Sequence, residues 1–194
     1  MSTIFKKNQS MKNIILICGP SGAGKDTLIR EARKYFASYP RVNFVKRYIT
    51  RPPDEFEDNF FVCEQGFNIL MQSNFFLVTW KSYGYFYGIP EYLIKEDCCN
   101  FISVSRKTIS FFEENFKNVY TIYVTADYET IKKRLTHRNR ENMNILKQRL
   151  NRYSFNVEAK NKIVFKNQGP LEVSVENFIS LCSSIISNFL DHGE

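Results

Sequence analysis

The chain has 194 residues, with 27 Lys and Arg against 20 Asp and Glu, and so a formal net charge of +7. This length favours one domain of ordinary size, and the 43% of apolar and 24% of charged residues exclude a disordered or fibrous protein. The positive charge leaves two classes of partner open, a nucleic acid or a small polyanion.

Residues 1–10 are expected to form a polar extension, with Met11 as a candidate natural start. They lack the apolar core of about 7 residues that a signal peptide needs. No apolar run in the chain approaches the roughly 18 residues of a membrane span. After the extension, apolar runs alternate with helical patterns, which predicts an α/β fold, a parallel sheet with helices on both faces. Strands are expected at 13–18, 42–49, 101–104, 119–124 and 162–165, and helices at 25–36, 105–116, 127–137, 142–153 and 171–190.

One segment breaks the alternation of strands and helices. Residues 54–90 are rich in aromatic side chains and contain two strand-like runs, 75–80 and 83–88. This pattern predicts a small inserted lobe of antiparallel strands with its own core. Residues 11–190 are therefore expected to form a single domain that carries this lobe at about 54–90.

A phosphate-binding motif follows the first predicted strand. Gly19-Pro20-Ser21-Gly22-Ala23-Gly24-Lys25 matches the Walker A pattern G-x-x-x-x-G-K and opens the first predicted helix. Glycines allow successive N–H groups to converge on phosphate oxygens, and the dipole of the following helix favours the same anion. We therefore expect this loop, together with Asp26 and Thr27, to bind ATP, with Lys25 bridging the terminal phosphates.

The residue after Lys25 departs from the Walker pattern. Ser or Thr is usual there, because its hydroxyl binds Mg²⁺, but this chain has Asp26. A first-turn acid is also favoured by the helix dipole alone. However, the neighbouring predicted strand at 101–105 ends without an acidic residue, and a carboxylate is a suitable ligand for Mg²⁺. The interpretation we favour is that Asp26 binds Mg²⁺ in place of that missing carboxylate.

Basic residues gather in two further parts of the sequence. Residues 132–152 contain eight Lys and Arg and a single acid, Glu141. Arginine binds phosphate oxygens with two parallel hydrogen bonds, although a basic solvated helix face would give the same pattern. On the other side of the loop, Arg47 and Arg51 precede the aromatic lobe, and Arg106 follows a predicted core strand. These three either face the pocket or are ordinary surface charges.

The cysteines and histidines predict neither a metal site nor a disulfide framework. The five cysteines form no C-x-x-C pair, and His137 and His192 are the only histidines. Buried, reduced thiols and a cytoplasmic location are expected.

A phosphate acceptor is ionised at neutral pH, so a kinase acting on one needs no histidine as general base.

These motifs together resemble the guanylate-kinase-like branch of the nucleoside monophosphate kinases, over residues 12 to about 185. The resemblance implies a five-stranded parallel sheet, a small acceptor-binding lobe and an Arg-rich lid at about 134–150. It rests on the phosphate loop, Thr50-Arg51, Tyr85-Phe86-Tyr87-Gly88, Lys133-Arg134-Leu135 with Arg138, and Arg149-Leu150.

The groups with which guanylate kinases hold guanine are missing. The resemblance implies one acid within 77–80, where this chain has Leu-Val-Thr-Trp, and another at 103, where it has Ser103. It also implies a hydroxyl at 89, where this chain has Ile89, and a second phosphate-binding arginine at 54, where it has Asp54. Without these groups, the N–H donors of a bound guanine would have no hydrogen-bond partners in a buried site, and its binding would be strongly disfavoured. Guanylate kinase activity is therefore not expected.

A closer resemblance is to the ribose 1,5-bisphosphate phosphokinases of phosphonate degradation. It rests on Gly24-Lys25-Asp26, Arg47-Tyr48-Ile49-Thr50-Arg51, Glu57 with Asn59, Trp80, Gly84 with Tyr87-Gly88, Ser105-Arg106 and Arg138 with Arg140-Glu141-Asn142. It implies transfer of the ATP γ-phosphate to ribose 1,5-bisphosphate, which makes 5-phosphoribosyl 1-diphosphate. The acceptor would be held by Arg47, Thr50, Arg51, Glu57, Tyr87 and Arg106, and the migrating group would be neutralised by Lys25, Arg134, Arg138, Arg140 and Arg149.

Two other classes of function remain as alternatives: a kinase with another acceptor, such as the GMP of guanylate kinases, and a non-catalytic interaction module or nucleic-acid binder. The intact Lys25 argues against a scaffold. A nucleic-acid surface should mix basic residues with aromatic ones, whereas here the aromatic residues cluster in the lobe. The expected partners are ATP with Mg²⁺ and a sugar bisphosphate, with no nucleic acid and no membrane, in a monomer or homodimer.

Overall fold

The computed structural model describes residues 10–52, 58–137 and 157–191. The first nine residues, the predicted helix at 142–153 and most of the predicted lid lie outside these ranges. Within them, no helix is both long enough and apolar enough to cross a membrane.

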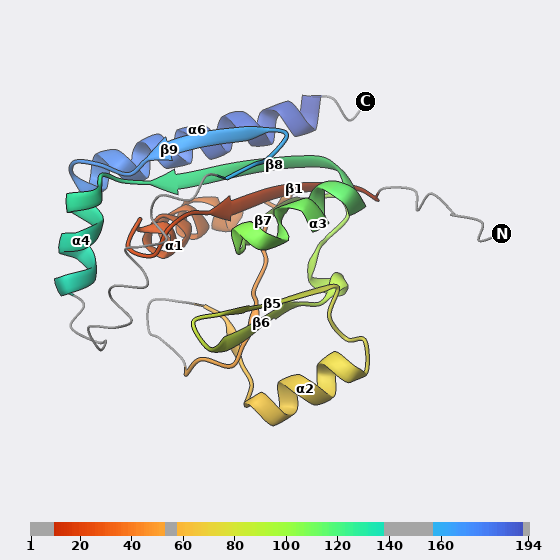
Figure 1. Ribbon diagram of the computed structural model, residues 1–194. Coiled ribbons are helices and arrows are strands. Elements are labelled where there is room, and N and C mark those ends of the chain that lie inside the picture. Colours follow the sequence, from red (N-terminus) through yellow and green to blue (C-terminus); the bar gives the residue numbers. More distant parts are fainter. Residues whose placement is uncertain (1–9, 53–57, 138–156, 192–194) are drawn as a thin grey trace.

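Five parallel strands form the central sheet, as the sequence predicts (Figure 1). The central strand β1 (Ser10–Cys18) is buried without exposure from Ile14 to Cys18. A parallel strand covered on both faces has this unbroken apolar sequence. In spatial order the strands are β2 (Val42–Phe44), β7 (Cys99–Ser103), β1, β8 (Phe116–Thr125) and β9 (Lys162–Lys166).

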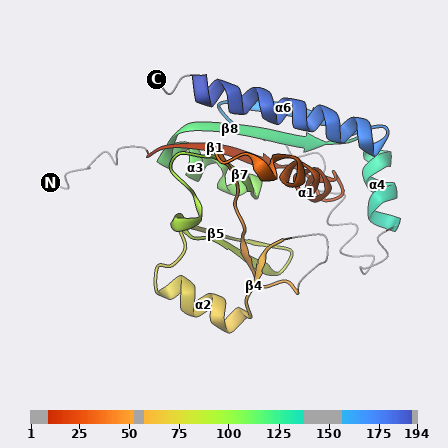
Figure 2. The ribbon, with the colours of Figure 1, turned by 180° about the vertical axis from the view of Figure 1, so that it is seen from behind.

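Helices cover the two faces of this sheet (Figures 1 and 2). Because successive strand residues point to opposite faces, neighbours in β1 belong to different cores. Ile15 packs in one core with Leu28 and Phe178, which come from α1 and α6. Leu16 packs in the other with Phe112 from α3. The helices are α1 (Lys25–Tyr35), α3 (Ile109–Asn115), α4 (Tyr128–His137) and α6 (Leu171–Asp191).

A second, four-stranded sheet lies on the side of the core sheet away from α6 (Figure 1). Its strands β5 and β6 form an antiparallel hairpin, whereas β3 and β4 pair in parallel. The Phe67 ring stacks on Phe76 and Phe86, with centroids 4.7 and 5.5 Å away, and so attaches α2 to this sheet. In spatial order the strands are β4 (Phe60–Phe61), β3 (Tyr48–Ile49), β6 (Tyr85–Ile89) and β5 (Val78–Ser82), and α2 spans Glu64–Gln72.

Two sequence predictions for this region are wrong. The expected single strand 42–49 is divided: β2 pairs in the core sheet and β3 in the second sheet. Val45, between them, is buried in the core that both sheets share, and the chain passes from one sheet to the other through Lys46 and Arg47. The helix α2 was not expected, because its apolar residues are interspersed among the aromatic residues that suggest strands.

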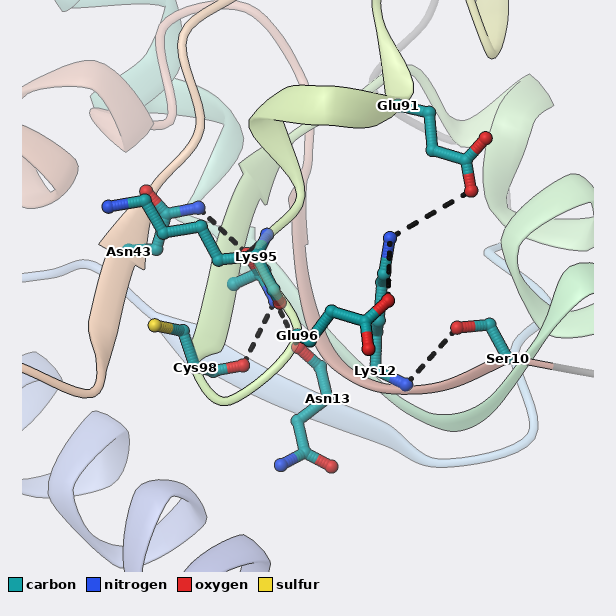
Figure 3. Close-up of polar contacts among 9 residues, drawn as sticks. Ser10, Lys12, Asn13, Asn43, Glu91, Lys95, Glu96 and Cys98 are labelled. Atoms are coloured by element: carbon teal, nitrogen blue, oxygen red, sulfur yellow. Dashed lines mark hydrogen bonds and ion pairs between the residues drawn. The ribbon is translucent and has the colours of Figure 1, made fainter.

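A buried side-chain amide connects the core sheet to the segment that runs from the second sheet back to β7. The side chain of Asn100 on β7 is fully buried; its Nδ2 donates to the carbonyl oxygens of Asn13 and Lys95, at 3.1 and 2.8 Å. Its Oδ1 accepts from Lys95 N and from Asn43 Nδ2, at 2.9 and 2.7 Å (Figure 3). Near this junction, Lys12 pairs with Glu91 and Glu96. These bonds fix the segment that links the second sheet to β7.

Candidate active site

A pocket opens between the phosphate loop, the end of β7 and the β5–β6 hairpin. Open α/β sheets bind ligands at the carboxyl ends of their strands, where this pocket lies. The second sheet forms its opposite wall. The lining residues are Gly19, Pro20, Ser21, Lys25, Asp26, Arg47, Arg51, Trp80, Ser82, Tyr83, Tyr85, Tyr87, Ser103, Val104, Ser105 and Arg106.

The phosphate loop has the conformation that its glycines permit. Gly24 has φ +85°, and a Cβ atom there would collide with the side-chain amide of Asn167. At Gly19, a Cβ atom would overlap the carbonyl oxygen of Val124 at the end of β8. The loop is therefore pressed against two neighbouring strand ends, and the chain then enters α1 at Lys25.

The side chain of Lys25 folds back over the phosphate loop that precedes it. Its Nζ donates to the carbonyl oxygens of Gly19 and Pro20, each at 3.0 Å. This holds the ammonium beside the N-terminus of α1, where a phosphate group is favoured. Asp26 lies next in the same turn and also lines the pocket. The two residues that the sequence predicts to bind ATP therefore line the same pocket.

Cys18, just before the loop, does not supply a nucleophile. Burial raises the pKa of its thiol to about 11, against the smaller opposite effects of Lys25 and Arg106. The thiol is therefore protonated at neutral pH, and only the thiolate is strongly nucleophilic. Cys18 is therefore not a candidate for a covalent intermediate.

Arg134 lies behind the loop rather than in the pocket lining. Its guanidinium donates to the carbonyl oxygens of Ala23 and Asn167, at 3.4 and 3.3 Å. The side-chain amide of Asn167 donates to the same Ala23 oxygen at 2.7 Å. Burial lowers the pKa of Arg134 from its usual value. In this conformation Arg134 supports the phosphate loop instead of facing a transferred group.

Three arginines from outside the phosphate loop line the pocket: Arg47, Arg51 and Arg106. Arg47 lies 5.7 Å over the centroid of the Tyr87 ring and donates to the carbonyl oxygen of Ser103 at 3.5 Å. Arg106 opens the short helical turn after β7. Together with Lys25 they make four basic groups, while Asp26 is the one acid among the described residues that line the pocket.

The β5–β6 hairpin presents one face to this pocket. Side chains of cross-strand partners lie on the same face, so the pairs Trp80–Tyr87 and Ser82–Tyr85 are aligned. The rings of Trp80 and Tyr87 are stacked, 5.3 Å apart and 4° from parallel. Beyond them, Ser82 and Tyr85 bring hydroxyl groups to the tip. The wall is therefore aromatic in the middle and polar at its end.

The turn of this hairpin has two residues with positive φ, Tyr83 at 50° and Gly84 at 85°. A two-residue turn with both residues in this region matches the right-handed twist of the strands. The left-handed region is uncommon for a tyrosine, and backbone strain of this kind is concentrated at binding sites. Here it brings Tyr83 into the lining of the pocket.

Several predicted site residues lie elsewhere. Thr50 does not line the pocket; its hydroxyl accepts from Phe86 N at 2.9 Å and so joins β3 to β6 beside Arg51. The lining also omits Gly22, Ala23, Gly24 and Thr27, which lie in the loop and the first turn of α1. Glu57, Arg138, Arg140 and Arg149 lie outside the described residues.

Other lining residues were not predicted as site residues. Trp80, Ser82, Tyr83 and Tyr85 come from the hairpin, and Ser103 and Val104 from the end of β7. Ser103 and Val104 could have been inferred from the rule that ligands gather at the carboxyl ends of parallel strands, which does not apply to the antiparallel hairpin. The same rule could have indicated Asn167, which follows β9 and contacts the loop.

Comparison with known proteins identifies relatives over most of the chain. A ribose 1,5-bisphosphate phosphokinase of Rhizobium etli is 32% identical over 179 residues, 90% of this chain and 91% of that protein. The phosphokinase of the same name from Acidiphilium cryptum is 36% identical over 149 residues, 75% of this chain and 80% of that protein. No protein-family model matches the sequence.

Solved structures show the same fold at low sequence identity. A guanylate kinase from Anaplasma phagocytophilum has a TM-score of 0.56 and 15% identity, with 92% of this chain and 88% of that one covered. A gluconokinase from Sinorhizobium meliloti has a TM-score of 0.52 and 12% identity, over 96% of this chain and 100% of that one. The fold is therefore that of the P-loop kinases, as the sequence predicts.

Proposed function

The chain belongs to the family of ribose 1,5-bisphosphate phosphokinases, and we propose that its pocket carries out the reaction for which that family is named. The protein is a kinase. It transfers the γ-phosphoryl group of ATP to the 1-phosphate of ribose 1,5-bisphosphate and releases 5-phosphoribosyl 1-diphosphate and ADP. In this reaction an oxygen of the acceptor phosphate bonds to the γ-phosphorus while the bond to the ADP oxygen breaks.

The charge of the pocket is the observation that supports this acceptor most strongly. Lys25, Arg47, Arg51 and Arg106 line it against one acid, Asp26. Guanylate kinases hold the N–H groups of guanine with carboxylates, and the second sheet contributes no carboxylate to the lining among the described residues. A sugar with two phosphate groups needs cations and hydroxyls, which this pocket has.

The described residues can promote the transfer without a general base. The acceptor phosphate is already ionised, so no proton has to leave before the attack. Phosphoryl transfer then depends on the alignment of the two phosphates and on neutralisation of their charge. We propose that Lys25 acts on the donor side and that Arg47, Arg51, Arg106 and Tyr87 hold the acceptor. Arg138, Arg140 and Arg149 stay predictions, as do the acceptor-binding role of Glu57, the cytoplasmic location and a monomeric or homodimeric state.

The donor set at the loop fits one Mg²⁺ ion. Asp26 lines the pocket beside Lys25 and offers a hard, anionic oxygen. Mg²⁺ is commonly held by one or two carboxylates together with substrate phosphates and water, so a single aspartate is sufficient. When bound, the ion would neutralise the charge of the phosphate oxygens. We propose Asp26 as its protein ligand.

Replacing Asp26 with serine is expected to weaken Mg²⁺ binding in the ATP complex at least about tenfold. The reason is that a neutral hydroxyl cannot replace the charge of the one acid that lines the described pocket. Calorimetric titration of Mg²⁺ into the protein with a non-hydrolysable ATP analogue measures the affinity directly. Glu31→Gln is the control, because Glu31 lies in the same helix and pairs with Arg30 and Lys34. Unchanged Mg²⁺ affinity in Asp26→Ser would remove the residue from the metal site.

A coupled assay of ADP release tests the function itself. Purified protein with ATP and Mg²⁺ is given ribose 1,5-bisphosphate, GMP, AMP or dTMP at equal concentrations. We expect turnover with the sugar bisphosphate and formation of 5-phosphoribosyl 1-diphosphate, with a kcat/KM for each nucleotide lower by several orders of magnitude. Turnover of GMP without turnover of ribose 1,5-bisphosphate would overturn the proposal in favour of a guanylate-kinase-like activity.

A further inference from the structure

Two adjacent residues, Asp58 and Asn59, hold three basic side chains in different ways. They precede β4 and lie beside residues 45–47, which connect β2 to β3. Asp58 binds with both carboxylate oxygens: Oδ2 accepts from Arg33 at 2.6 Å, and Oδ1 lies 2.7 Å from Lys46 Nζ. Burial lowers the pKa of Arg33, and Asp58 opposes this effect. Arg33 belongs to α1, so Asp58 fastens the second sheet to the kinase core.

Asn59 makes a different contact, with the pocket arginine next to Lys46. Its Oδ1 accepts from both the backbone N and the Nε of Arg47, at 3.2 and 3.3 Å. The backbone pairs at the same point, because Phe60 N donates to the Arg47 carbonyl oxygen at 2.8 Å. Main chain and side chain of Arg47 are therefore held by one amide oxygen.

This double contact sets the direction of the Arg47 guanidinium. While Nε is held by Asn59, a terminal nitrogen of the guanidinium donates to the Ser103 carbonyl oxygen at 3.5 Å, and the group lies over the Tyr87 ring. Ser103 and Tyr87 both line the pocket. An arginine has a long, flexible side chain, and fixing it before binding removes part of the entropic cost of holding a ligand.

The chemical type of the residue at position 59 is as important as its geometry. A carboxylate there could accept the same two hydrogen bonds, as the neighbouring Asp58 does with Arg33 and Lys46. It would also bring a negative charge beside a phosphate of the acceptor and repel it. The neutral amide orients the guanidinium without adding negative charge to the pocket.

We propose that Asn59 is a positioning residue of the acceptor site, which aims Arg47 at a phosphate group of the acceptor and does so through a neutral oxygen. This inference rests on the proposed function for the identity of the acceptor. It assigns to Asp58 the separate task of attachment between the second sheet and α1.

Two variants test the two parts of the proposal. Asn59→Ala removes the accepting oxygen, and we expect the acceptor KM to rise about 10-fold to 100-fold with the ATP KM unchanged, as for loss of hydrogen bonds to a charged group. Asn59→Asp keeps the oxygen and adds charge. We expect an unchanged unfolding temperature but a raised acceptor KM, and this increase should shrink as salt is added, because ions screen the new repulsion.

The matched control is Asn68→Asp, which makes the same change in charge on α2, on the face of the second sheet opposite the pocket. Its acceptor KM should equal that of the wild type. The series is run with whichever acceptor the wild-type protein uses in the coupled assay. Failure with ribose 1,5-bisphosphate in the wild type would therefore count against the proposed function, whereas an unchanged acceptor KM in either Asn59 variant would overturn the positioning role.

Discussion

Replacing Lys25 with alanine is expected to lower kcat by about 10²-fold to 10³-fold, the usual effect of removing one preorganised group that stabilises transition-state charge. The Lys25 ammonium is held over the phosphate loop by the carbonyl oxygens of Gly19 and Pro20, at 3.0 Å each. No other basic residue of the described pocket comes from the loop or from α1. Steady-state kinetics with saturating ATP and acceptor measures the loss.

The control for this variant is Lys34→Ala in the same helix. Lys34 is exposed and pairs with Glu31 within one turn, so its replacement should leave kcat unchanged. Thermal unfolding of both variants separates a catalytic loss from a loss of stability. A Lys25→Ala protein that folds normally and retains wild-type kcat would contradict the assignment of the loop as the site of transfer.

Replacing Arg51 with alanine is expected to abolish most turnover at low acceptor concentration by raising the acceptor KM about 10-fold to 100-fold, with the ATP KM little changed. Arg51 lines the pocket on the side proposed to bind the acceptor. It follows Thr50, whose hydroxyl accepts a hydrogen bond from Phe86 N in β6. A charge-assisted hydrogen bond to a phosphate is stronger than one between neutral groups, so its loss should appear mainly in acceptor binding. Initial rates over a range of acceptor concentrations, at fixed ATP, give the two constants.

Arg41→Ala is the matched control for charge. Arg41 is exposed and its Nε donates to the carbonyl oxygen of Asp97, on the linking segment rather than in the pocket. We expect wild-type constants for it. If the acceptor KM of Arg51→Ala were also close to wild type, Arg51 would have no part in acceptor binding.

The pocket also gives a physical meaning to the net charge of +7. Four basic side chains converge on one cavity from α1, from the β2–β3 crossing, from the segment after β3 and from the turn after β7. Cations gathered in a cleft raise the local concentration of an anionic substrate and speed its association. This arrangement favours two small polyanions, ATP and a sugar bisphosphate, as the partners of the excess charge.

The core sheet and the phosphate loop could be predicted from the amino-acid sequence. Each depends on a pattern that is local in the chain: an unbroken apolar run for the buried β1, and a glycine-rich turn with Lys25 where that strand meets α1. The sequence pattern alone left open whether Arg47, Arg51 and Arg106 face the pocket or are surface charges, and the fold brings all three into its lining.

The way in which the remaining elements pack together could not be predicted from local sequence patterns. Residues 42–49 are predicted as one strand, yet β2 and β3 pair in different sheets, and Val45 between them is buried in the core that both sheets share. The aromatic wall of Trp80 and Tyr87 depends on the register of the β5–β6 hairpin.

The hydrogen bonds from Arg47 to Asn59 and from Asn167 to the phosphate loop likewise have no signature in the local sequence. Asn167 reaches Ala23 across 144 residues. Local periodicity records which face of an element is buried, but not which distant side chain will meet it there. For that reason the sequence predicts the kind of chemistry proposed for this site, whereas the contacts that surround the site could be read only from the folded chain.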